Sequence, residues 1–175
     1  MVFGGFLLVE KFGYSVAEMT ALLLVNSVLN LWLAPRIGRL VAHWGERRVL
    51  TLEYAGLVAV FLGYAVVGDA RIAAGLYVLD HVFFAMAIAL KTYLQKIGDP
   101  GDMAPTAAVS FTINHIAAVV VPVGFGLLWL VSPAAVFVAG AVGAGTSLVL
   151  ARFVPDDPGP GRETTVAAPT LARPA

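Results

Sequence analysis

Cysteine is absent from this 175-residue chain, and charged residues make up only 13% of it. A typical soluble domain carries about 25% charged residues. Without cysteine the chain forms no disulfide, thiolate nucleophile or cysteine metal site. Formal net charge is zero, so there is no basic surplus for nucleic acid. A Gly-rich phosphate loop, an HExxH motif and a serine elbow are also missing from the sequence. These absences predict neither an enzyme nor a nucleic-acid-binding protein, and no cofactor or metal.

Long apolar runs dominate what is present, with hydrophobic residues at 59% of the chain. The few charges cluster between these runs. A run of about 18 or more apolar residues is long enough to cross about 30 Å of hydrocarbon. Five stretches predict full transmembrane helices: 16–34, 49–67, 72–90, 107–131 and 134–153. The expected fold class is therefore an all-α membrane protein, a polytopic helical bundle whose first partner is the lipid bilayer.

Shorter segments complete the predicted organisation. Residues 1–9 are apolar but too short to span, and are interpreted as the end of a helix, an N-terminal stub. Ser15 is placed to cap the next helix together with Glu18, and Pro35 is expected to end that helix. Ser132-Pro133 predicts a minimal turn. Residues 1–153 thus form the expected bundle, followed by a disordered tail at 154–175 that is rich in proline, glycine, threonine and alanine.

Lysine and arginine predict the orientation. One side of the predicted bundle carries most of them: Arg36, Arg39, Arg47, Arg48, Lys91, Lys96, Arg152, Arg162 and Arg173. The other side has only Lys11 and Arg71. Positive charge favours the cytoplasmic side of a membrane. We therefore expect a multi-pass protein of the cytoplasmic (inner) membrane with its C-terminus in the cytoplasm. Trp32, Trp44 and Trp129 are near predicted span ends, where they would anchor at the membrane interface.

The loop after the first full helix carries a compact group of glycine and basic residues: Gly38, His43, Gly45, Arg47 and Arg48. The plain interpretation is a tight turn whose cations set the topology and meet lipid phosphates. Gly38, Gly45 and Arg47 also stand at the spacing of G-x-x-x-D-R-x-G-R-R, and in this the loop resembles the cytoplasmic signature of the major facilitator superfamily. Departures from that signature are Ala42 for its aspartate, His43 for its first arginine and Glu46 for a later basic residue.

The resemblance implies a larger transporter. The five helices look like helices eight to twelve of a twelve-helix protein, and the stub looks like the end of helix seven. The implied function is secondary active transport of a small-molecule substrate by alternating access. This chain would supply one of the two halves, and its partner would be a missing N-terminal six-helix half or a second copy. The alternative is a non-transporting membrane fragment or interaction module.

Two polar pairs fall at membrane depth. Asp80 and His81 lie about eight residues, or about 12 Å, into the third helix, and Asn114 and His115 lie similarly deep in the fourth. Within a core of about 30 Å the pairs come within about 6–8 Å in depth, near the midplane. Such residues usually face the bundle interior. They are candidates for a polar cavity in which Asp80 or a histidine takes up a proton. The alternative is a contact that only fixes two helices together.

Two further groups are candidates for function. Asn26 and Asn30 are four residues apart, hence on one helix face. They either line the same cavity or hydrogen-bond across a helix interface, and we favour the interface. Pro122, Gly124 and Gly126 predict a kink in the fourth helix, which serves either as a hinge or only to shape packing.

Overall fold

The computed structural model describes residues 2–166. Within this range the chain forms α1 (Val2–Phe12), α2 (Val16–Trp44), α3 (Glu46–Val66), α4 (Ala70–Ala85), α5 (Ile88–Ile97), α6 (Met103–Val131) and α7 (Pro133–Ala151). Since α5 continues α4 after a short break, the described residues contain 5 helical stretches long and apolar enough to cross a membrane. This confirms the prediction of about five membrane-length helices preceded by a short one.

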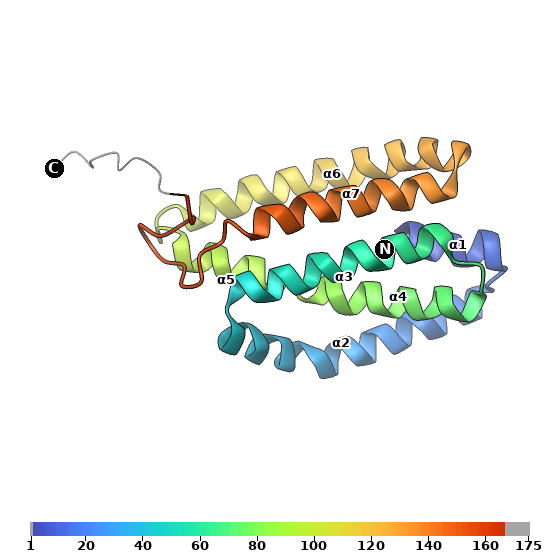
Figure 1. Cartoon of the computed structure of the whole chain (residues 1–175), viewed down its shortest axis with the longest axis horizontal. Coiled ribbons are helices and arrows are strands. Elements are labelled where there is room, and N and C mark those ends of the chain that lie inside the picture. Colours follow the sequence, from blue (N-terminus) through green and yellow to red (C-terminus); the bar gives the residue numbers. More distant parts are fainter. Residues whose placement is uncertain (1, 167–175) are drawn as a thin grey trace.

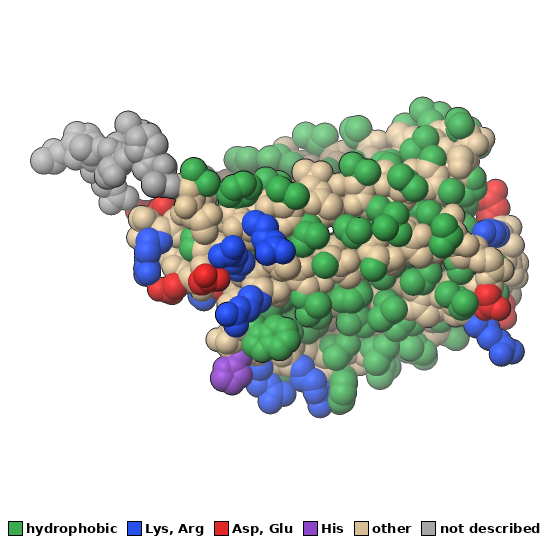
Figure 2. Space-filling model, in the orientation of Figure 1, with side chains coloured by type: hydrophobic (Ala, Val, Ile, Leu, Met, Phe, Trp, Pro, Cys, Tyr) green, Lys and Arg blue, Asp and Glu red, His purple; other side chains and the backbone are tan. Residues whose placement is uncertain are grey.

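The long helices run side by side along the molecule (Figure 1). The most extensive packing is between α3 and α7; α4 packs on α3, α2 on α4, and α6 on α7. Hydrophobic side chains cover the long sides of the molecule, and charged side chains gather at its two ends (Figure 2). An apolar flank between charged ends is the surface expected of a membrane protein.

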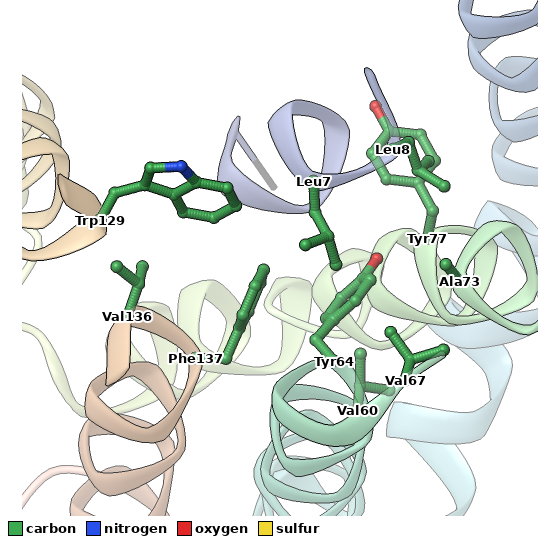
Figure 3. Close-up of a cluster of buried hydrophobic side chains, with 10 residues drawn as sticks. All are labelled: Leu7, Leu8, Val60, Tyr64, Val67, Ala73, Tyr77, Trp129, Val136 and Phe137. Atoms are coloured by element: carbon green, nitrogen blue, oxygen red, sulfur yellow. The ribbon is translucent and has the colours of Figure 1, made fainter. Parts of the chain in front are cut away.

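The short helix α1 is held by a core cluster at one end of the bundle (Figure 3). Leu7 and Leu8 of α1 pack with Tyr64 of α3 and Phe137 of α7. Tyr64 and Phe137 stack with their ring centroids 4.9 Å apart. A side chain on Gly4 would place its Cβ 2.9 Å from the Tyr64 hydroxyl, so glycine leaves room for the Tyr64 side chain against α1.

Trp129 belongs to this same cluster, which corrects its predicted role as an interface anchor. Only 7% of it is exposed, and its indole nitrogen donates a 2.7 Å hydrogen bond to Glu10. Phe3 and Phe6 of α1 pack on its ring. Trp129 therefore joins α6 to α1 inside the protein.

Proline 35 does not end its helix, contrary to the prediction, and the basic segment after it is helical as far as Trp44. A proline inside a helix removes one backbone hydrogen bond and frees carbonyl groups. By helix geometry the carbonyl that loses its donor is that of Leu31. Nearby, Arg36 donates to the carbonyl of Trp32 at 2.6 Å, and Arg39 donates to that of Pro35 at 3.4 Å. The helix ends instead at Gly45, whose φ of 80° lies in the left-handed region that glycine adopts most easily.

The third predicted span, in contrast, is broken. α4 ends at Ala85 and α5 begins at Ile88. Across the break, the amides of Met86 and Ala87 bond to carbonyls only three residues back, a tighter winding than the α-helix. Because glycine and proline are missing from residues 84–89, no local residue signals this break.

Two helix starts agree with the prediction. Ser15 and Glu18 form the capping box, with each side chain bonded to the other residue's backbone amide. Ser132 caps α7, and Pro133 occupies its first turn. Helix starts with such residues are readable from sequence because the capping chemistry is local.

Residues 154–166, which we expected to be disordered, form turns that fold back on the bundle. Asp156 contacts Arg47 of α3 at 3.4 Å, and the Tyr93 hydroxyl of α5 donates to the carbonyl of Glu163. The amide of Thr165 donates to the carbonyl of Phe153 at 2.9 Å. Residues 167–175, the rest of the predicted tail, lie outside the described part of the chain.

Basic segments lie at one end of the bundle. The α2–α3 turn, α5 and the residues after α7 are together at that end, and the α1–α2, α3–α4 and α6–α7 connections are at the other (Figure 1). We call the first the basic end, after the lysines and arginines that the sequence analysis grouped there. Arg173 of that group lies beyond the described residues.

Candidate functional site

A groove of about 610 Å³ lies between α5 and the first half of α6, within the size range of small-molecule sites. We call it the α5–α6 groove. Its polar lining residues are Lys91 and Gln95 from α5, Asp99 and Asp102 from the connecting loop, and Thr106, Ser110 and Asn114 from α6. Its apolar lining includes Leu94, Ile97, Met103 and Phe111. The groove therefore opens at the basic end and reaches Asn114, about 11 residues and about 16 Å into α6.

A tight loop at Gly98–Asp102 sets the mouth of the groove. Asp99 accepts a 2.9 Å hydrogen bond from the Gly101 amide through its side chain, and a 2.9 Å bond from the Asp102 amide through its carbonyl. The next helix starts at once, with the amide of Thr106 bonded to the carbonyl of Asp102. This turn reverses the chain so that α6 returns past α5.

Asn114 is the predicted site residue that lines the α5–α6 groove. Its neighbour His115 is exposed and lies on another part of the helix surface, since adjacent helical residues point about 100° apart. The His115 Nδ1 is 3.0 Å from the carbonyl of Phe111, and the two rings are 3.9 Å apart. Asn114 and His115 therefore both lie on the surface of α6 at membrane depth.

Asp80 lies in a different place. It is 2% exposed and lines a separate small cavity of about 70 Å³ with Tyr64 of α3, Gly4 of α1 and Phe125 of α6. His81 does not share that cavity lining; its Nδ1 is 2.8 Å from the carbonyl of Tyr77. Asp80 and Asn114, which we expected to be near each other, therefore line two different cavities.

Asn26 and Asn30 differ in environment although they share a helix face. Asn26 is 5% exposed, and both polar atoms of its amide have no hydrogen-bond partner among the described residues. Asn30 is exposed. Neither asparagine therefore forms the interhelical hydrogen bond that we favoured from the sequence. Asn26 instead bears the cost of a buried amide without partners.

Most of the glycine and basic residues that resemble the transporter signature surround a polar hollow of about 320 Å³ at the basic end. Gly45 makes the turn, and His43, Arg47 and Arg48 line the hollow with Asp156. Gly38, by contrast, lies within α2 with open space where a side chain would be. In this chain the signature positions therefore form a helix end and the first turn of the next helix.

The predicted hinge lies inside a continuous helix. α6 passes through Pro122 without a break, and a Cβ on Gly124 or Gly126 would meet nothing within 4 Å among the described residues. The two glycines are therefore not required for close packing within the described part of the bundle. Their role as a hinge stays a prediction.

The sequence analysis did not place Glu46, Glu53 or Tyr64 in the interior. Glu46 and Glu53 are each 2% exposed, and Tyr64 contributes its hydroxyl to the small cavity beside Asp80. These residues share one face of α3 with Val49, Leu50, Leu57 and Val60. The sequence signal was the helical spacing of that apolar face. A glutamate at the same spacing lies on the same face and is buried with it.

Comparison with known proteins identifies no relative: no protein-family model, curated protein or solved structure matches the chain. Residues 2–166 also contain no group of three or more histidine or acidic side chains arranged to hold a metal ion. The functional argument therefore depends on the geometry of the cavities and on the exposed polar residues.

Proposed function

We propose that this chain is one body of a secondary active transporter for a small solute, of the major facilitator type. Its partner body is an N-terminal six-helix half or a second copy of the chain. The observation that carries the proposal is the exposure of Asn30, Asn114 and His115 on helices long enough to span a membrane. Polar groups are costly against lipid, so these faces of α2 and α6 need water or protein beside them.

The packing of the bundle supports a second body. α2 and α6 each pack on one side only, α2 mainly on α4 and α6 on α7, and almost all positions of α6 before Pro122 are exposed. A water-filled pathway between two helical bodies accounts for a helix that is unpacked and polar at its centre. Lipid alone accounts for the apolar positions but not for the polar ones.

Asp80 is the residue that we assign to proton coupling. It is buried at membrane depth and lines the cavity between α1, α3, α6 and α7. A charged carboxylate is expensive in an apolar interior, whereas a neutral one is much less so.

The proposed location is the cytoplasmic membrane. Basic residues concentrate at the end that holds the α2–α3 turn and the residues after α7 (Figure 2). By the positive-inside rule this end faces the cytoplasm, which also places the C-terminus there. The solute then moves between the basic end and the opposite end.

Proton-coupled uptake tests the proposal. The complete protein, this chain together with its partner body, is reconstituted in vesicles loaded with a pH-sensitive dye, an inward proton gradient is imposed, and sugars, amino acids, organic anions and amphipathic amines are added in turn. We expect one class to accelerate collapse of the gradient. Asp80→Asn should abolish that acceleration, whereas Asp69→Asn, at an exposed helix cap that asparagine also serves, should leave it intact. A complete, folded protein that responds to no class would support the alternative of a non-transporting module.

A further inference from the structure

The charges of the α5–α6 groove follow an order along its length. Lys91 precedes Ile97, the last residue of α5, by six positions, so it lies about 9 Å further from the mouth. Asp99 and Asp102 are at the mouth itself. This arrangement would complement a ligand whose negative group lies deep in the groove, near Lys91, and whose positive group lies at the mouth, near the two aspartates.

An apolar track continues inward from Lys91. Ile88 lies three positions before it in α5, on the same helix face, and is 41% exposed. Phe84, on α4 before the break, is 54% exposed. On the α6 side, Phe111 lines the groove. These side chains form a surface suited to a hydrocarbon chain.

We propose that the α5–α6 groove binds a phospholipid with an ammonium headgroup, of the phosphatidylethanolamine kind, from the leaflet at the basic end. Its phosphate meets Lys91, its ammonium group meets Asp99 and Asp102, and one acyl chain follows Ile88 and Phe111. The groove is lined by Asn114, one of the residues on which the proposed function rests, but the inference requires no transport.

The chemistry of such a lipid matches the order of the lining residues. Its phosphate lies next to the acyl chains, and its ammonium group lies further out, toward water. The flexible stem of Lys91 lets its ammonium reach toward the headgroup region, and the hydroxyls of Thr106 and Ser110 are available to phosphate oxygens. A purely anionic lipid would face two aspartates without a cation of its own, which disfavours it.

Binding is tested with native mass spectrometry on the full chain in detergent micelles. Four probes are added: lysophosphatidylethanolamine, lysophosphatidylglycerol, free phosphoethanolamine and dodecylamine. They separate the zwitterionic amphiphile from an anionic one, from a headgroup without a chain and from a cationic one. The variants are Lys91→Gln and Asp99→Asn combined with Asp102→Asn, and the matched control is Arg152→Gln, a basic-end residue outside the groove lining.

The expected result is that lysophosphatidylethanolamine binds more tightly than the other three probes. Lys91→Gln should weaken it by about fivefold, the effect of one cation on a lipid phosphate. The double aspartate variant should remove the preference over lysophosphatidylglycerol, and Arg152→Gln should change neither. Equal binding of the two lysolipids by the native chain, or equally tight binding of free phosphoethanolamine, would overturn the inference. Since no gradient is used, these outcomes are independent of whether the chain transports.

Discussion

Lys96 of α5 places its Nζ 2.7 Å from Oε1 of Glu46, the first residue of α3. The glutamate side chain is 2% exposed, and that of the lysine is 48% exposed. Glu46 occupies a position where the transporter signature that this loop resembles has a basic residue. Here an acidic residue at that position binds a cation from another helix, so the pair joins the start of α3 to the end of the broken span.

Removal of Lys96 should destabilise the bundle, because it leaves a buried carboxylate without its cation. We expect Lys96→Met to cost about 1–2 kcal/mol, the lower part of the range for bonds to charged groups, since solvent screens the half-exposed lysine. Thermal unfolding in micelles measures the change. Addition of Glu46→Gln should recover part of the loss, whereas Arg152→Met, at an exposed position of the same end, should have little effect. Equal effects of Lys96→Met and Arg152→Met would contradict the ion pair's role.

Gly56 should tolerate no side chain. A Cβ there would lie 2.3 Å from the ring of Phe83 on α4, and overpacking of this kind costs about 1–3 kcal/mol. Gly56→Ala should therefore lower the unfolding temperature. The control is Gly143→Ala on α7, where a Cβ meets nothing within 4 Å among the described residues. If the two variants unfold at the same temperature, the α3–α4 contact is not as close as described.

Docking of the residues after α7 should weaken in acid. Hydrogen bonds from the backbone amides of Gly161 and of Glu163 itself hold the pKa of the Glu163 carboxyl below its usual range. Because this pKa is lower in the docked segment than in a free chain, the contribution is present above the free value, about 4.3, and is lost as the pH falls through the docked value. A spin label on Val166→Cys should become more mobile below about pH 4. Glu163→Gln should remove that pH dependence, and an unchanged profile in this variant would exclude the glutamate as its cause.

Helix content was largely predictable from the sequence, because apolar runs of membrane length and local caps define it. Ser15 with Glu18, and Ser132 with Pro133, mark helix starts through contacts within one turn. Pro35 misled the prediction because the helix continues through it to Trp44, at the loss of one backbone hydrogen bond. The break after Ala85 had no local signal and depends on packing between helices.

The candidate site was less predictable. Depth along a helix placed Asp80 and Asn114 near the midplane, but depth does not specify direction around the helix or which neighbour lies there. The structure consequently assigns Asp80 to the small cavity beside Tyr64, and Asn114 to the α5–α6 groove. Lys91 was interpreted only as a topology signal, because its place in one groove with the α6 hydroxyls depends on the tertiary fold.

The most direct test of the account is whether water reaches the exposed polar face of α6. The chain has no native cysteine, so a single introduced thiol can be labelled without background. Thiols react as thiolates, which form in water and not in hydrocarbon. In vesicles that hold the chain together with its partner body, His115→Cys should react with a membrane-impermeant maleimide. Val142→Cys, at a 65% exposed apolar position near the middle of α7, should react only after the vesicles are dissolved in denaturing detergent. Equal protection of both thiols in intact vesicles would contradict the water-lined pathway and, with it, the proposed transporter.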